Sequence, residues 1–270
     1  MADYYKLDKI FVQGTTYTLP NDRFYVIRKI GTNAASAAYL KIDGVDTGAI
    51  VADVAPLHKT SSNLLGPLDL GDYFYVVPPN KKFWIEGPSG AKVRCIGEIG
   101  KLAPGEGIPT NFANRFESQG KVYKTYVTGS ATLAAAGGSW AAGAETEVLS
   151  LTPKTIEKYL FNDIVMALLS NAATAPTEGD VAIRFFLEGA PFDLLTTEAG
   201  KLGVDLYSAP KPPADSSEEE PFSLKDRPIE VLGDRTFSVK AVNTSGAAIS
   251  ASTTAAMTLA VWLLTIYSKS

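Results

Sequence analysis

Short apolar runs that alternate with turn residues make up most of the chain. The runs are rich in Val, Ile, Tyr, Phe and Thr, and residues such as Gly, Pro, Asn and Asp separate them. This pattern is typical of all-β sandwiches. We predict strands over residues 9–18, 23–30, 37–42, 72–77, 82–86, 93–99, 121–128, 181–187, 236–242 and 257–267. The sequence therefore predicts an all-β protein.

One stretch favours a helix instead. Thr152 is a good N-cap, and Pro153 suits the first helical position because its missing N–H has no partner there in any case. Ile156 and Leu160 then follow the helical period of apolar residues. The sequence predicts one short helix over residues 153–160.

Two segments of twenty residues, 67–86 and 221–240, resemble each other. Five aligned pairs are identical: Pro67/Pro221, Leu70/Leu224, Asp72/Asp226, Val77/Val231 and Phe83/Phe237. We interpret each segment as a hairpin, in which a strand, a tight turn at Asn80 or Asp234 and a second strand follow one another. The segments predict that one motif is used twice.

The same order of turns supports an internal duplication. An Asp-Gly pair at 43–44 precedes the first segment, and a Glu-Gly pair at 188–189 precedes the second; both are typical of tight turns. We therefore predict two tandem jelly-roll-like β-sandwich domains, residues 1–103 and 121–270. Residues 104–120 are rich in Gly, Pro, Asn and Ser and are expected to form the linker between them.

Composition narrows the classes of function. The chain has 270 residues, 46% hydrophobic and 20% charged, which excludes a wholly disordered protein and a multi-span membrane protein. The net charge is −4 and no Lys/Arg run exceeds two residues, so there is no strong signal for nucleic-acid binding. A single cysteine, Cys95, and a single histidine, His58, exclude a disulfide framework and multi-Cys or multi-His metal sites. We expect no cofactor and no metal.

The ends of the chain bear on its location. The first residues lack the apolar core of a secretory signal, so we expect no secretory export. Residues 247–267 carry no charge and form either a buried strand or a tail anchor. Only 257–266 is densely apolar, which is too short to cross a bilayer, so a strand is favoured and membrane contact is not expected.

An acidic, Pro-rich stretch at 208–221 predicts an exposed loop in the second domain. Its acidic side chains Glu218, Glu219 and Glu220 are candidates for contacts with a partner. A solvated surface loop without a partner is the alternative interpretation.

Aromatic residues supply the other candidate contacts. Tyr73 and Tyr75 alternate with Phe74 and are expected to share one face of a strand. Trp140 lies in a Gly/Ala-rich stretch with little to bury it, and we expect it to be exposed and functional.

Motifs for catalysis are missing. His58 is the only imidazole available as a base, it lies in a loop-like stretch, and the chain has no G-x-S-x-G motif. Cys95 fits a buried strand position better than a reactive site. A carboxylate pair for glycoside hydrolysis stays open, because the distance between two acids is not set by sequence spacing. We expect a protein that is not an enzyme.

Two successive β-sandwich halves with many small side chains and no catalytic group resemble the tandem (double) jelly-roll structural proteins of viruses, which include capsid, spike and decoration proteins. The resemblance implies a non-catalytic virion protein that is made in the host cytoplasm. It also implies self-assembly through sandwich faces, as a homotrimer or larger, together with other virion proteins. The alternative is a carbohydrate- or receptor-binding β-sandwich module, and a β-rich hydrolase is a third hypothesis.

Overall fold

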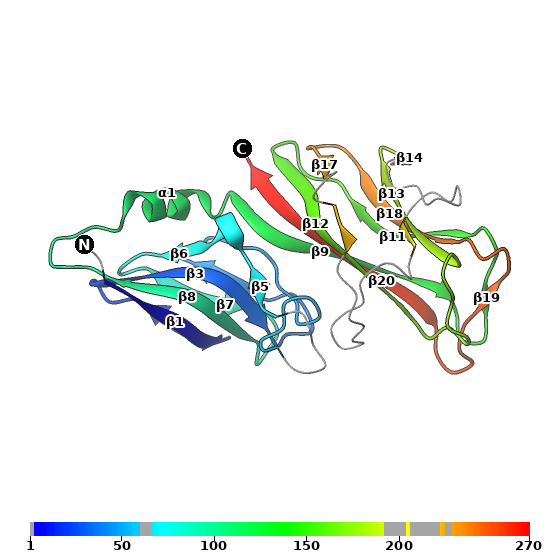
Figure 1. Cartoon of the computed structure of the whole chain (residues 1–270), viewed down its shortest axis with the longest axis horizontal. Helices are drawn as coiled ribbons and strands as arrows, with labels where there is room; N and C mark the ends of the chain where they lie inside the picture. The colour runs from blue at the N-terminus through cyan, green and yellow to red at the C-terminus, as the bar shows by residue number, and fades with distance from the viewer. Residues whose placement is uncertain (1–2, 60–65, 192–203, 206–221, 225–227) are drawn as a thin grey trace. The chain divides into compact units, whose positions relative to one another are not determined.

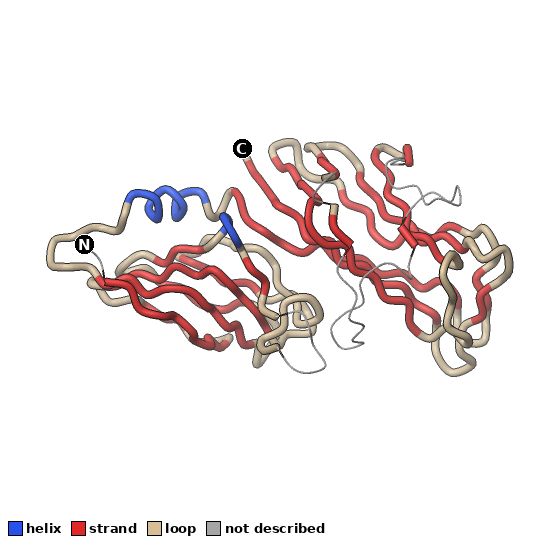
Figure 2. The backbone as a smooth tube through the Cα atoms, in the orientation of Figure 1, coloured by secondary structure: helices blue, strands red, loops and turns tan. Residues whose placement is uncertain are grey.

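The computed structural model describes residues 3–59, 66–191, 204–205, 222–224 and 228–270. The chain divides into two compact units, Met1–Tyr126 with Ile266–Lys269, and Val127–Thr265 with Ser270. Strands make up most of both units (Figure 2). This confirms the prediction of an all-β protein.

The first unit is a sandwich of two antiparallel sheets with one helix. Its elements are β1 (Asp3–Val12), β2 (Thr16–Thr18), β3 (Arg23–Thr32), β4 (Tyr39–Ile42), β5 (Leu68–Asp69), the 3₁₀ turn η1 (Gly71–Tyr73), β6 (Tyr75–Val77), β7 (Lys82–Glu86), β8 (Lys92–Lys101) and α1 (Thr110–Ser118). One sheet has the order β1-β8-β3-β5, with β6 also on β3, and the other has the order β2-β7-β4. Figure 1 shows α1 beside β6 in this unit.

The second unit contains two larger sheets and a short pair. Its strands are β9 (Val122–Ala134), β10 (Ser139–Trp140), β11 (Glu145–Leu151), β12 (Glu157–Ser170), β13 (Val181–Leu187), β14 (Ala190–Pro191), β15 (Val204–Asp205), β16 (Phe222–Ser223), β17 (Ile229–Val231), β18 (Phe237–Asn243), β19 (Ile249–Ser250) and β20 (Met257–Lys269). The first five residues of β9 and the last four of β20 are counted with the first unit. One sheet has the order β9-β20-β12-β16, with β17 also on β12. The other has the order β11-β18-β13-β14, with β15 also on β13, and β10 pairs with β19.

The two units repeat one topology. The order β1-β8-β3-β5 in the first corresponds to β9-β20-β12-β16 in the second, and β2-β7-β4 corresponds to β11-β18-β13. The register repeats as well, since Tyr25 pairs with Val77 in the first unit and Tyr159 pairs with Val231 in the second. When the adjacent short strands β5 and β6, β16 and β17, and β14 and β15 beside β13 are counted with their sheet, the chain passes alternately between two antiparallel sheets, which is the jelly-roll arrangement. The chain is a tandem jelly roll.

The repeated segments form corners rather than hairpins. β6 pairs with β3, whereas β7 pairs with β2 and β4 in the opposite sheet; β17 and β18 separate in the same way. Asn80 and Asp234 occupy the turns, and each has a φ of 61°. The hairpin prediction is wrong because a left-handed Asn or Asp reverses the chain locally in either arrangement. Pairing with other strands then decides which sheet each arm joins.

The turns upstream of these corners are as predicted. Both residues of each turn have positive φ: 52° and 82° at Asp43 and Gly44, and 53° and 77° at Glu188 and Gly189. This is the signature of a tight β-turn of type I′. The backbone N–H of Asp43 donates to the carbonyl oxygen of Lys82 at 2.7 Å, and that of Glu188 donates to the equivalent oxygen of Thr236 at 2.8 Å. The duplication predicted from the sequence therefore extends to individual hydrogen bonds.

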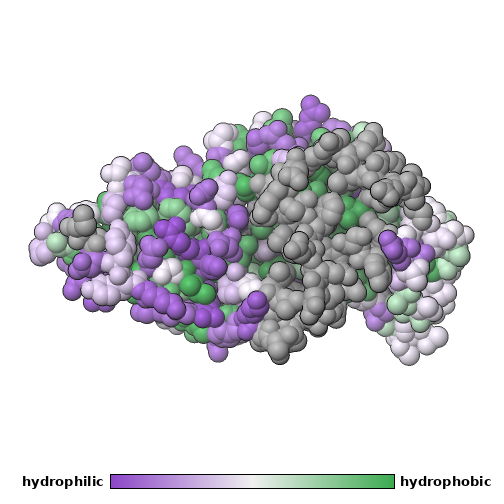
Figure 3. All heavy atoms as spheres, viewed as in Figure 1, coloured by the Kyte–Doolittle hydropathy of each residue, from purple (hydrophilic) through white to green (hydrophobic). Residues whose placement is uncertain are grey.

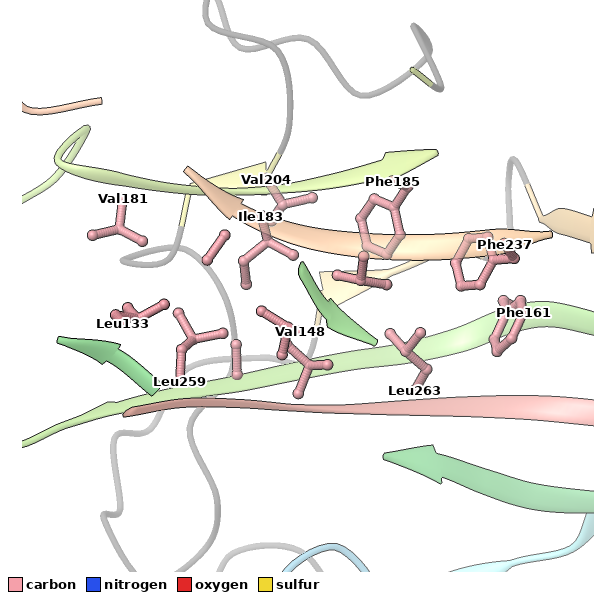
Figure 4. Packing of buried hydrophobic residues seen from close by; sticks show 14 of the residues in the cluster. Leu133, Val148, Phe161, Val181, Ile183, Phe185, Val204, Phe237, Leu259 and Leu263 are labelled. Carbon is pink, nitrogen blue, oxygen red and sulfur yellow. The ribbon is translucent and has the colours of Figure 1, made fainter. Parts of the chain in front are cut away.

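The core of the second unit lies between its two larger sheets (Figure 4). Ile183 and Phe237 come from one sheet, and Leu259 and Leu263 come from the other; all four are fully or almost fully buried. Phe161 stacks on Phe237 with ring centres 4.6 Å apart. Apolar residues that alternate along each strand thus meet between the sheets.

The predicted helix over 153–160 is wrong. β12 begins at Glu157, and its Tyr159 and Phe161 pair with β17. Sheet pairing outweighs the capping signal of Thr152 and Pro153, because burial against neighbouring strands contributes more than local propensity.

The described residues contain one α-helix, α1, and it lies within the expected linker 104–120. Phe112 of α1 is buried in a cluster with Phe24 of β3, and Phe116 packs against the same cluster. Arg115 donates hydrogen bonds to the carbonyl oxygens of Phe74 and Tyr73. The two phenylalanines, four residues apart, bury one helix face within an otherwise Gly/Pro-rich segment.

The last long apolar run is a strand, as predicted. Met257, Leu259 and Val261 of β20 are buried in the second core. Among the residues that the structure describes, no helix has both the length and the apolar content to cross a membrane.

Candidate interaction surface

Strand β1 lies at the edge of its sheet. All ten of its residues pair with β8, from Asp3 opposite Lys101 to Val12 opposite Lys92. Of the strands that the structure describes, only β8 pairs with β1 (Figure 1). A long strand with one unpaired edge is a template for pairing with another chain.

The side chains of β1 alternate between two faces. Leu7 and Phe11 are buried, and the ring of Phe11 lies 4.9 Å from that of Phe83 in the opposite sheet. Tyr5 and Lys9 share their parity and therefore lie on this inner face. The even-numbered residues of β1 lie on the outer face.

Exposed apolar side chains gather on this strand. Hydrophilic residues cover most of the first unit on the side shown in Figure 3, where hydrophobic ones show as small patches. Seven large hydrophobic side chains are exposed among the described residues, and four of them lie on β1: Tyr4 (48% exposed), Tyr5 (56%), Ile10 (42%) and Val12 (36%). β1 is therefore the main apolar feature of the described surface.

A hollow of about 360 Å³ opens beside β1, where the two sheets of the first unit meet. Phe11, Tyr17, Tyr25 and Phe83 line it, with the rings of Phe11 and Tyr17 centred 4.9 Å apart. Lys9 lies at its rim, with Nζ 3.5 Å from the Tyr25 hydroxyl. The hollow suits an aromatic or aliphatic side chain with a polar end.

A charged cluster holds the middle of β1 against β8. Arg94 donates two hydrogen bonds to the Asp8 carboxylate, at 2.7 Å from Nε and 2.8 Å from Nη2. These bonds hold the pKa of Asp8 below its ordinary value. Nη1 of Arg94 also lies 3.1 Å from Nδ1 of His58. The single histidine therefore lies against a guanidinium on the surface.

Cys95 occupies the buried strand position that the sequence predicts. Burial raises the pKa of its thiol far above the ordinary value, so the reactive thiolate is suppressed. Within the described ranges, no group of three His, Cys, Asp or Glu residues could hold a metal ion.

The structure corrects the expectation for Trp140, which is only 3% exposed. Its Nε1–H donates a hydrogen bond to Thr146 at 3.1 Å, and its carbonyl oxygen accepts one from Asn243 at 3.0 Å. The small residues around it in sequence form turns that bring β10 onto β19, so the indole is covered by distant segments. The local sequence held no sign of this cover.

Tyr73 and Tyr75 do not share a strand face. Tyr73 ends the η1 turn, whereas Tyr75 begins β6 and is 1% exposed. The hydroxyl oxygen of Tyr75 accepts a hydrogen bond from the backbone N–H of Gly48, and burial raises its pKa to about 12. Tyr75 is therefore part of the interior.

The acidic candidates Glu218, Glu219 and Glu220, and the loop 208–221 that holds them, lie outside the described residues. Tyr4, Tyr5 and Ile10 were not among the contact residues predicted from the sequence. The mixture of apolar and charged residues along 3–12 hid them, because their exposure follows from the position of β1 at the sheet edge.

No family model matches the chain, and no curated protein matches it. It is similar to the solved structure of the STIV MCP, at 9% identity over 97% of this chain and 96% of that one, with a TM-score of 0.33. It is similar to the PBCV-1 virus capsid, at 12% identity over 98% and 94%, also with a TM-score of 0.33. BuGH86 in complex with neoagarooctaose is similar at 10% identity and a TM-score of 0.24, and this chain covers 34% of it. These scores are too low to indicate a function.

Proposed function

We propose that the chain is a structural protein of a virion, which assembles with further copies of itself and with other virion proteins and catalyses no reaction. The observation that carries the proposal is β1, a ten-residue edge strand with four exposed large apolar side chains. Edge strands of monomeric proteins are usually short, charged, interrupted by proline or covered. β1 also carries exposed charges, but its length and its four exposed large apolar side chains favour pairing with another chain.

The rest of the fold supports a structural role. Each jelly roll has its own pair of sheets. The second also has a continuous hydrophobic core built from its own residues, and β1 contributes nothing to it. The tandem jelly-roll architecture, which resembles viral structural proteins, favours a virion as the setting. We expect a trimer or a larger assembly, held by apolar contacts with charged residues that set the register.

The absence of catalysis is part of this proposal. It is supported by the buried thiol of Cys95 and by the position of His58, whose Nδ1 lies 3.1 Å from Nη1 of Arg94. Both residues are thereby poorly placed to act as nucleophile or base.

A binding module for carbohydrate or a receptor is the second candidate. The hollow beside β1 favours it, because Tyr17 and Tyr25 combine aromatic rings with hydroxyl groups and Lys9 adds a donor at the rim. Such a surface can stack on a sugar ring and bind its hydroxyl groups.

The native mass of the full chain in solution tests the proposal. Light scattering behind a sizing column should show a species well above the 28.7 kDa of one chain. Ile10→Lys should lower that mass, because a lysine would place a charge in the apolar edge. Ile156→Lys is the matched control, since Ile156 is similarly exposed, at 48%, in the second unit.

A monomer at every concentration would contradict self-assembly. Binding of that monomer to a glycan panel, lost on Tyr17→Ala, would then support the binding module instead.

A further inference from the structure

We propose that β1 pairs antiparallel with β1 of a second copy across a twofold axis centred on Leu7, and that Tyr5 of each copy enters the aromatic hollow of the other. The inference rests on the proposed self-assembly and names one of its contacts. Such an interface is isologous, because the same strand serves both copies. The β1–β1 interface makes one continuous sheet from the sheets of two copies. The two copies are either single chains or members of two larger assemblies.

The geometry of a twofold sheet leaves few registers. Residues directly opposite each other in an antiparallel pair have side chains on the same face. If the inner faces of both copies lie on one side of the joined sheet, an odd-numbered residue must face an odd-numbered one. The pair is therefore centred on one residue, and near the middle of β1 the candidates are Lys6, Leu7 and Asp8.

Charge selects among these three registers. A centre at Lys6 places Asp3 opposite Lys9 twice but sets two lysines directly opposite each other at the axis, and a centre at Asp8 places two aspartates opposite each other. A centre at Leu7 places Lys6 opposite Asp8 of the second copy, twice by symmetry. Opposite charges across a strand pair stabilise it, and like charges destabilise it. Asp8 is ready for this role, because Arg94 keeps it ionised while its side chain stays 33% exposed.

The same register matches the exposed apolar residues. It places Tyr4 opposite Ile10 of the second copy on the outer face, so two of the exposed side chains of β1 cover each other. Aromatic and β-branched residues form favourable cross-strand pairs. One register therefore satisfies both the charges and the apolar side chains.

The inner face supplies the aromatic anchor. In this register Tyr5 lies opposite Lys9 of the second copy, and Lys9 lines the rim of the hollow. Tyr5 is the most exposed of the large hydrophobic side chains on β1, at 56%. The rings of Phe11 and Tyr17 touch each other, so the Tyr5 ring can pack beside Tyr17 in the open part of the hollow, with the ammonium of Lys9 of the second copy near its face. Buried aromatic anchors of this kind dominate the energy of interfaces.

Two complementary charge variants test the pairing. Lys6→Glu places Glu opposite Asp8, so it should weaken self-association about tenfold, since two favourable pairs become repulsive. The double variant Asp8→Lys with Arg94→Glu places lysines opposite Lys6 and retains an ion pair within each chain. It should weaken self-association to a similar extent. When the two proteins are mixed, each new charge meets an opposite one, and association should recover to within about threefold of the unmodified chain.

Sedimentation velocity on the full-length proteins gives the association constants, and thermal unfolding shows that each variant is folded. Tyr5→Ala should weaken association about tenfold, and Tyr5→Phe should retain most of it. Lys154→Glu, an exposed lysine of the second unit, is the matched charge control and should change nothing.

Recovery on mixing supports the pairing. The pairing is wrong if the mixture associates no better than either variant alone, or if neither variant is weakened. In both cases, self-association of the unmodified chain would still support the proposed function. If the unmodified chain does not associate, both fail.

Discussion

Strands β1 and β9 occupy the same place in the two jelly rolls, yet they present different edges. Both are the outermost strand of their sheet, beside β8 and β20 respectively. The exposed residues of β9 are small and polar: Thr128, Ser130 and Thr132. Those of β1 include Tyr4, Tyr5, Ile10 and Val12. Topology therefore sets where an edge lies, and side chains decide whether it stays solvated or is suited to a partner.

The space behind the two edges differs as well. In the second unit, a Cβ on Gly129 of β9 would lie 2.4 Å from the backbone oxygen of Val148 in β11, so the two sheets approach closely at this edge. At the corresponding edge of the first unit, between β1 and β2, the sheets leave the aromatic hollow. Gly129 therefore allows the two sheets of the second unit to approach closely at the β9 edge, whereas bulky aromatic side chains border the hollow at the β1 edge of the first unit.

The largest expected effect is on stability, and it distinguishes residues that only stabilise the fold from those that also line the hollow. Phe83 and Phe237 occupy equivalent positions after the two corners, and both are buried. Replacing either one with alanine should lower the free energy of unfolding by about 3–5 kcal/mol, because each leaves a cavity. Phe83→Ala should also weaken self-association, since the Phe83 ring lines the hollow, whereas Phe237→Ala should not. Urea denaturation and sedimentation measure the two effects. Equal association of the two variants would break the assignment of the hollow to the interface.

The close approach at β9 predicts the next largest effect. Gly129→Ala should lower the free energy of unfolding by about 1–3 kcal/mol, because the added methyl group forces backbone apart from backbone. The control is Ser130→Ala, at the position next to Gly129. A change at another glycine such as Gly137 would not serve, because Gly137 has a φ of 69° and any side chain there would strain the backbone. Ser130→Ala should change stability by no more than about 0.5 kcal/mol. Urea denaturation measures both, and an unchanged Gly129→Ala protein would show that the edge is not closed by this contact.

A graft sharpens the comparison of the edges. Thr128→Ile combined with Thr132→Ile gives β9 two exposed apolar residues, as on β1. The variant should self-associate several-fold more strongly than the unmodified chain, because an apolar edge favours pairing. The control is Thr128→Ser with Thr132→Ser, compared by sedimentation velocity. No gain in association would mean that apolar exposure needs the hollow beside it.

The smallest effect is a pH dependence at β1. Because the pKa of Asp8 is lowered in the folded chain, its contribution is present above the ordinary pKa, near 3.9, and is lost as the pH falls through the lower folded value. The side chain is partly exposed, so the contribution is about 0.5–1 kcal/mol. Asp8→Asn should therefore be less stable than the unmodified chain at pH 7, and this difference should be smaller at pH 2. Urea denaturation at both values checks this, and a constant difference would assign the effect to packing.

Much of the fold could be predicted because many strands and turns depend on residues that are close together in the sequence. The turns at 43–44 and 188–189 need positive φ, which their Asp-Gly and Glu-Gly pairs supply. The terminal strand was recognisable because ten apolar residues are too few to cross a bilayer. Cys95 was placed in the interior by its apolar surroundings within a strand.

The errors arose where distant segments compete with local preference. The signal for a helix at 153–160 lost to pairing between β12 and β17, and the helix α1 formed where Phe112 and Phe116 find an apolar sheet face. Trp140 is buried in the core cluster of the second unit, and its strand β10 pairs with β19, about a hundred residues further along the chain.

By itself, the sequence determined the all-β class, the duplicated pattern and the turns at 43–44 and 188–189, because these depend on residues within a few positions of one another, whereas the strand predicted over 9–18 is broken by a turn at Gly14. Only the tertiary structure decided which strands pair, which aromatic residues are covered and which strand forms an open edge. The physical reason is that pairing and burial are properties of two surfaces that meet. The exposed tyrosines of β1 are candidates for contacts because the strand has an unpaired edge and lies beside the hollow.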